Sequence, residues 1–137
     1  MKLIKAILRA ILAGAMITVG IMHFTNEPFF TRIVPAWLPM AKLLVYVSGV
    51  CEIALGALVL VPKTRRFAGL GLTALYIAVF PANINMVLHP ELGGTVPTWA
   101  LWARLPFQIL FIVFALWVTE ALSAPNTAAA SSKPRTS

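Results

Sequence analysis

Four long apolar stretches constrain this chain more than any other feature of its sequence. They run from Ile7 to Phe24, Ala41 to Val61, Phe67 to Leu88 and Ala100 to Leu122. Each is about 18 to 23 residues long, and a helix needs about 20 apolar residues to cross the core of a bilayer. None shows the two-residue alternation of a barrel strand. The sequence therefore predicts an all-α integral membrane protein, folded as a four-helix bundle.

The composition supports this prediction, because it leaves little material for a water-facing surface. Hydrophobic residues make up 60% of the chain, charged residues 11%, and the mean hydropathy is +0.89. A soluble protein of this size needs more charge. We expect residues 1–122 to form one transmembrane domain. Residues 123–137, rich in Ser, Ala, Thr and Pro without periodicity, are predicted to be a disordered cytoplasmic tail.

The basic residues predict the orientation of the bundle. The formal charge of +7 does not form one basic stripe with interleaved aromatics, so nucleic acid is not an expected partner. Lysine and arginine gather before the first stretch, between the second and third, and in the tail. Basic residues concentrate on the cytoplasmic side of membrane proteins. Both termini and the middle loop are therefore predicted to be cytoplasmic, in a multi-pass protein of the inner (plasma) membrane. The residues are Lys2, Lys5, Arg9, Lys63, Arg65, Arg66, Lys133 and Arg135.

Three local patterns refine the expected bundle. The apolar run between Arg9 and the small residues at 13–15 is too short for a signal peptide, so the first helix is expected to stay uncleaved. The proline- and aromatic-rich loop 25–40 is expected to lie at the outer surface and cap the bundle. Small residues allow close approach of helices, and two sets are expected to do so: Ala6, Ala10, Gly14 and Thr18 on the first helix, Gly49 and Gly56 on the second.

Polar side chains inside the spans are few, and all fall in the outer half. Such groups are costly in hydrocarbon, so each is a candidate for function. Glu52 lies about 16 Å into the second span, near the midplane. We expect it to pair with Arg104, with Gln108 as an intermediate hydrogen-bond partner. A purely structural clasp between helices and a ligand site both remain open. The candidate ligand-binding residues are His23, Glu52, Asn83, Asn85, Arg104 and Gln108.

Two prolines and the metal-binding residue types bear on what this cluster does. Pro81 and Pro106 interrupt the third and fourth spans beside it, so they either shape a small outward pocket or only bend the helices. His89 precedes Pro90 at a helix end, which disfavours a haem ligated by His23 and His89. The single cysteine, Cys51, excludes a CxxC pair and a cysteine-rich zinc site. No metal is expected.

Several segments, taken in order, resemble the DoxX-like family of small membrane proteins, over roughly residues 4–122. The resemblance implies a four-helix inner-membrane protein. Some DoxX-like proteins are membrane subunits of thiosulfate–quinone oxidoreductases or of redox-stress assemblies, and the family supplies no settled catalytic residues. The segments are Gly20 to Phe24, Val34-Pro35 with Pro39, Ser48 to Glu52 with Gly56, Phe80 to Met86 and Arg104 to Gln108.

Three hypotheses of function follow. The first is an accessory subunit of a redox system, with a redox protein as partner, which binds a lipophilic ligand such as a quinone while Glu52 relays protons. The second is a non-enzymatic scaffold whose polar cluster only locks the fold. The third, solute transport, is weaker because the spans hold too few charges for a continuous path. Under the first two, the chain is not expected to be an enzyme on its own.

Overall fold

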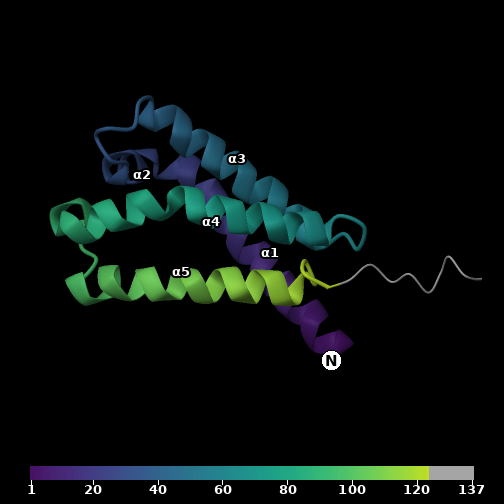
Figure 1. Cartoon of the computed structure of the whole chain (residues 1–137). Coiled ribbons are helices and arrows are strands. Elements are labelled where there is room, and N and C mark those ends of the chain that lie inside the picture. Colours follow the sequence, from purple (N-terminus) through teal and green to yellow (C-terminus); the bar gives the residue numbers. More distant parts are fainter. Residues whose placement is uncertain (124–137) are drawn as a thin grey trace, which may run out of the picture.

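Five α-helices and one short 3₁₀ helix make up the computed structural model, which describes residues 1–123 (Figure 1). Four helices are long and apolar enough to cross a membrane, and the described residues contain no strand. The predicted all-helical fold with four spans is therefore confirmed. The elements are α1 (Lys2–Thr25), α2 (Glu27–Ile33), α3 (Ala41–Val59), α4 (Arg65–Leu88), η1 (Pro90–Gly93) and α5 (Thr98–Val118).

The helix ends differ from the apolar stretches for two physical reasons. α1 and α4 begin earlier, at Lys2 and Arg65, because basic residues are good helix formers even though they lower the hydropathy. α5 ends at Val118 rather than at Leu122. The chain leaves the helix there, because Glu120 adopts a left-handed backbone conformation with φ 56°.

The predicted surface loop between the first two spans contains the short helix α2. It begins with Glu27 and Pro28, a favourable helix start, and Thr31 donates a hydrogen bond of 2.5 Å to Glu27. Its last residue, Ile33, is buried in a small apolar cluster with Met86, Val87 and Leu101. α2 thus packs across α3, α4 and η1 at one end of the bundle.

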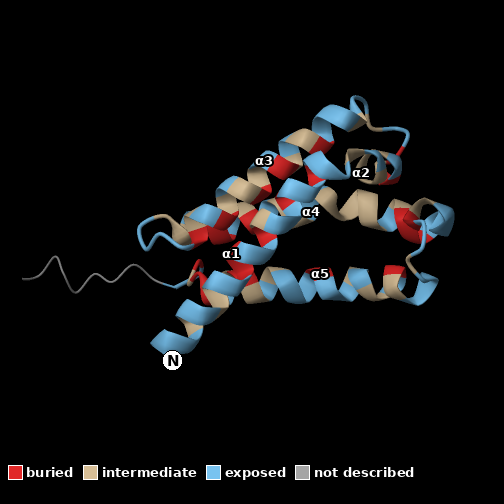
Figure 2. Cartoon of the chain, turned by 180° about the vertical axis from the view of Figure 1, so that it is seen from behind, coloured by how far each residue is buried: buried red, intermediate tan, exposed pale blue. Residues whose placement is uncertain are grey.

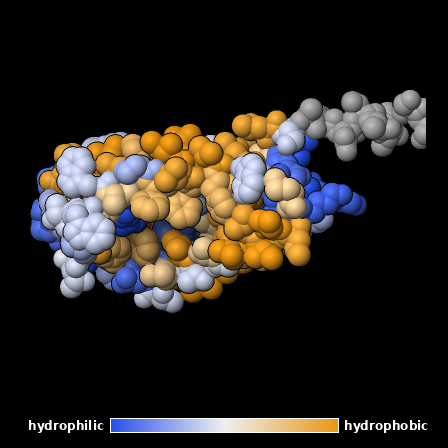
Figure 3. Space-filling view, turned by 90° about the horizontal axis from the view of Figure 1, so that it is seen from below, coloured by the Kyte–Doolittle hydropathy of each residue, from blue (hydrophilic) through white to orange (hydrophobic). Residues whose placement is uncertain are grey.

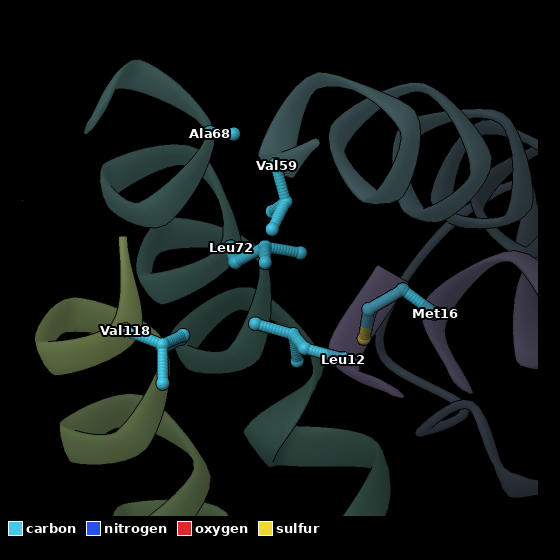
Figure 4. Packing of buried hydrophobic residues seen from close by; sticks show 7 residues of the cluster. Leu12, Met16, Val59, Ala68, Leu72 and Val118 are labelled. Carbon is cyan, nitrogen blue, oxygen red and sulfur yellow. The ribbon is translucent and has the colours of Figure 1, made fainter. Parts of the chain in front are cut away.

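The opposite end holds the main apolar core, to which all four long helices contribute (Figure 4). Its side chains point toward one another and are almost fully buried. We call this half of the molecule the basic half, because the basic residues of α1 and α4 lie at its end, and the other the α2 half. The core residues are Leu12, Met16, Val59, Ala68, Leu72, Ala115 and Val118.

Glycines fix the crossing of α1 and α3. A Cβ atom on Gly20 would lie 2.8 Å from the carbonyl oxygen of Gly49, and a Cβ on Gly49 would lie 2.9 Å from that of Gly20. Gly56 similarly faces Ala13 and Met16 of α1. The backbones therefore approach as closely as small residues permit, as expected for Gly49 and Gly56.

The small-residue stripe expected on the first helix does not make such a contact. Ala6, Ala10, Gly14 and Thr18 are exposed, and a Cβ on Gly14 would meet nothing within 4 Å. The buried face of α1 instead carries Leu12, Met16 and His23. The prediction was wrong because small residues permit close packing without requiring it, and larger side chains fill this core better.

Basic side chains tie the helices together at the basic end. Glu120 accepts hydrogen bonds from Arg65 (2.7 Å) and Lys5 (3.3 Å). The bond from Lys5 and the nearby positive charges hold the pKa of the Glu120 carboxyl below its usual value. Arg9 donates to the Val118 carbonyl (3.1 Å) and Arg66 to that of Ser123. The predicted tail, 123–137, lies beyond this point and, except for Ser123, outside the described residues.

The outward faces of the long helices are apolar. Figure 2 shows exposed residues along the outside of the bundle and buried ones toward its axis. Many of the exposed side chains are large and hydrophobic, among them Ile77, Ile109, Leu110 and Val113. In water this surface would be unfavourable, whereas in hydrocarbon it is the expected exterior.

Candidate ligand-binding site

A cavity of about 560 Å³ occupies the α2 half of the bundle. α1, α3, α4 and α5 form its walls, and α2 with the segment after it contributes Phe30, Ile33, Val34 and Leu38. Figure 3 shows a hollow in the apolar surface with hydrophilic atoms in its floor. At the basic end, Lys5 and Arg9 of α1 form hydrogen bonds at the C-terminal end of α5. Toward α2 the two helices diverge, and the cavity lies in that part of the bundle (Figure 1).

The cavity brings together five of the six candidate residues: His23, Glu52, Asn83, Arg104 and Gln108. The rest of its lining is mostly aliphatic and aromatic. Three further polar or reactive side chains line it that the sequence analysis did not select, Ser48, Cys51 and Tyr76. Helical spacing was the available signal, because residues three, four or seven apart share a face. Ser48 lies four positions before Glu52, and Cys51 lies three positions after Ser48. Tyr76 lies seven positions before Asn83.

His23 and Glu52 form a buried pair across the contact of α1 and α3. His23 Nδ1 lies 3.0 Å from Glu52 Oε2, and both side chains are less than a tenth exposed. The same Nδ1 atom lies 2.9 Å from the carbonyl oxygen of Val19. Phe30 stacks on the imidazole with ring centroids 3.9 Å apart. The glycine crossing thus determines which histidine meets the carboxylate.

This pairing corrects the prediction that Glu52 would find Arg104 or Gln108. Depth along a span can be counted from the sequence, but the direction in which a helix turns its polar face cannot. Gly20 and Gly49 lie at the contact of α1 and α3, beside Glu52 and His23 respectively, so this contact turns the Glu52 carboxylate toward α1. Arg104, on α5, has no carboxylate within salt-bridge distance among residues 1–123.

Asn83 and Gln108 fasten α4 to α5 on the far wall of the cavity. Asn83 donates a hydrogen bond of 2.7 Å from Nδ2 to Gln108 Oε1. Gln108 in turn donates from Nε2 to the carbonyl oxygen of Tyr76. The Tyr76 hydroxyl donates to Met16 Sδ at 3.0 Å, which links α4 to α1. Two separate polar clusters, rather than one, therefore border the cavity.

Arg104 has few partners among the described residues for the number of donors that it carries. Its hydrogen bond within residues 1–123 is a weak one, from Nη1 to the thioether of Met86 at 3.8 Å. Pro106 lies two residues further along the same helix, as expected, and the helix continues through it. A guanidinium has five N–H donors, so Arg104 retains donors for a group inside the cavity.

Asn85 does not belong to this site. Its Nδ2 donates to the backbone carbonyl of Ile33 at 3.0 Å, and it does not line the cavity. The bond holds the C-terminal end of α2 against α4. Two positions separate Asn85 from Asn83, which turns its side chain to a different face of the helix.

The histidines lie in different environments. His23 is buried against Glu52, whereas His89 is exposed beside Glu91, with Nδ1 3.4 Å from the carboxylate. Within residues 1–123, no three His, Cys, Asp or Glu side chains gather closely enough to hold a metal ion.

These features define a multi-pass helical membrane protein with an apolar-walled cavity in one half of the bundle. By sequence, the chain belongs to the family described as "Domain of unknown function (DUF8561)", whose model matches residues 12–119. That stretch contains every residue that lines the cavity. No curated protein and no solved structure matches the chain.

Proposed function

We propose that this protein binds a lipophilic small molecule in the cavity of the α2 half. The observation that supports this most is the cavity itself, about 560 Å³ with a largely apolar lining and a few polar groups that converge on it. Sites for small ligands have this volume and this distribution of polarity. The side chains around such a cavity have few protein neighbours on that side, and a bound molecule would supply the missing contacts.

The polar groups divide into those already engaged and those with capacity left. Asn83 and Gln108 are mostly occupied with each other and with the Tyr76 backbone. Arg104 retains nearly all its donors, and Glu52 Oε2 is buried without a well-directed hydrogen bond. Arg104 and Glu52 are therefore the principal contacts that we propose for a ligand, with Asn83, Gln108 and His23 in support.

The orientation in the membrane is part of the proposal. Lys5, Arg9, Arg65 and Arg66 gather at one end of the bundle, which supports a cytoplasmic location for that end and for both termini. The cavity would then lie in the outer leaflet of the inner (plasma) membrane. A lipophilic ligand would reach it from the hydrocarbon, because α2 covers the end of the bundle.

A redox-associated role is the more specific form of this proposal. It rests on the resemblance to DoxX-like proteins, some of which are subunits of quinone-linked assemblies. The chain would act as an accessory membrane subunit beside a redox protein partner, with a quinone as the candidate ligand, and not as an enzyme by itself. The apolar walls suit a quinone ring and its tail, and Arg104 suits a ring oxygen.

A second candidate function is a scaffold whose polar residues are structural. One set of contacts favours it: Asn83, Gln108 and Tyr76 link α4 to α5, and His23 with Glu52 links α1 to α3. On this view the cavity holds only lipid chains.

Arg104→Ala separates the two functions. Because Arg104 has one weak hydrogen bond, we expect the variant to fold with a stability within about 0.5 kcal/mol of the wild type, yet to lose its ligand. Protein purified in mild detergent would be extracted, and its lipophiles quantified by mass spectrometry. Arg32→Ala, on the exposed face of α2, is the matched control. A wild-type protein without a stoichiometric lipophile, or equal retention by Arg104→Ala, would contradict the ligand-binding function.

A further inference from the structure

The contacts of His23 locate a proton in the buried pair. The Val19 carbonyl oxygen, 2.9 Å from Nδ1, can only accept a hydrogen bond. Nδ1 must therefore carry the proton and direct it toward Val19. Glu52 Oε2 also lies 3.0 Å from Nδ1, but this N–H group points toward Val19 and leaves Oε2 without a well-directed donor.

The carboxylate consequently keeps acceptor capacity that the protein does not use. Oε2 is buried and has no well-directed hydrogen bond, and Glu52 is among the residues that line the cavity. A buried carboxylate short of donors is costly and favours any donor that reaches it. Because Glu52 lines the cavity, a donor bound there can reach its carboxylate.

A membrane amphiphile can offer Glu52 either a cationic amine or a neutral hydroxyl as donor, and the charge of Arg104 bears on which of them the cavity accepts. The Arg104 guanidinium lines the same cavity without a carboxylate partner among residues 1–123. A cationic amine would be repelled by this charge, whereas a neutral hydroxyl is not. An oxygen elsewhere on the ligand would instead accept from the guanidinium.

We infer that the cavity selects a neutral amphiphile that donates a hydroxyl hydrogen bond to Glu52, in preference to an analogue of the same shape without the hydroxyl proton. This inference rests on the proposed ligand-binding function and adds the chemical group that the site recognises. Glu52 is the specificity-determining residue, and His23 positions it.

A matched pair of probes tests the inference: para-dodecylphenol and its methyl ether, which differ by the donor. The full chain is placed in phosphatidylcholine nanodiscs with equal amounts of both probes, and the retained ratio is measured by mass spectrometry against empty nanodiscs. We expect the wild type to prefer the phenol by about tenfold or more, as a hydrogen bond to a charged group implies. Glu52→Gln keeps the side-chain shape but not the charge, and should lower this preference several-fold.

Glu27→Gln is the control, because Glu27 contacts Thr31 and Lys42 outside the cavity; it should keep the wild-type preference. Equal retention of both probes by the wild type would overturn the inference and leave the proposed ligand binding intact. An unchanged preference in Glu52→Gln would also overturn it. If neither probe is retained above empty nanodiscs, the proposed function fails together with the inference.

Discussion

The two halves of the bundle are held together by different interactions. In the basic half, seven aliphatic or small residues from all four long helices fill the axis, and basic side chains bind Glu120 and the carbonyl groups of Val118 and Ser123. In the α2 half, polar pairs join neighbouring helices and a cavity occupies the axis.

The difference shows that the helices associate through different interactions in the two halves. Helices in lipid associate through packing and hydrogen bonds, since hydrocarbon provides no hydrophobic drive between them. In the basic half, the four long helices associate mainly through the packing of apolar side chains. The α2 half relies on the glycine crossing of α1 with α3 and on hydrogen bonds from α4 to α5, and so tolerates an open interior.

The largest expected effect follows from breaking the glycine crossing. Gly49→Leu places a side chain where a Cβ would already lie 2.8 Å from His23 Cβ and 2.9 Å from the Gly20 carbonyl. The backbones of α1 and α3 must separate, at a cost of about 3 kcal/mol. Unfolding in mixed micelles titrated with dodecyl sulfate measures this loss.

Gly14→Leu is the matched control for the crossing. It puts the same residue on a helix whose glycine faces open space, and should change stability by less than about 0.5 kcal/mol. An equal loss at positions 14 and 49 would show that the contact between α1 and α3 is not what the leucine at position 49 disrupts.

These glycines also show what the sequence could and could not predict. The number of spans follows from hydropathy, because a helix that crosses a bilayer needs a long uninterrupted apolar stretch. The rotation of each helix does not, because the exposed residues Ala6, Ala10 and Gly14 look as suited to packing as Gly49 and Gly56 do. Without that rotation, the partner of Glu52 could not be chosen correctly.

The depth of the candidate site residues along the helices could be predicted from the sequence, but which of them pair could not. Six polar residues at similar depths in the four apolar stretches suggested a cluster, and five of them line one cavity because helical register fixes depth well. Asn85 lies at nearly the same depth as Asn83, but two positions turn its side chain by about 200° around the helix, so it contacts α2 and does not line the cavity. The α2 helix went unnoticed as a helix because it is short and its proline-rich flanks hide the pattern.

A smaller effect is expected from shortening two leucines of α4, one that packs in the apolar core and one that lines the cavity. Leu72 is fully buried in the core of the basic half, and Leu72→Ala should cost about 2 kcal/mol, near the low end for such truncations because the separated helices are already in lipid. Leu75 lines the cavity, so Leu75→Ala only enlarges an existing space and should cost about 0.5 kcal/mol. The dodecyl sulfate titration compares them directly, and equal losses would mean that the cavity wall is as tightly packed as the apolar core.

The smallest expected effect concerns the ionic contacts that close the basic end. Glu120 has a pKa below its usual value, chiefly because Lys5 hydrogen-bonds to the carboxylate and because positive charges lie nearby. A lowered pKa in the folded state means that ionised Glu120 stabilises the fold at neutral pH. This contribution is fully present above the usual carboxyl pKa and is lost as the pH falls through the lowered one.

The carboxylate is partly exposed, so its contribution should stay below about 1 kcal/mol. Glu120→Gln should therefore lower the thermal unfolding temperature slightly at neutral pH and match the wild type in acid, a difference that salt weakens. Glu91→Gln removes an exposed carboxylate from the α2 end and serves as control. If Glu91→Gln reproduced the pH-dependent difference, the ionic contacts at the basic end would not be its cause, and the two ends of the bundle would be electrostatically equivalent.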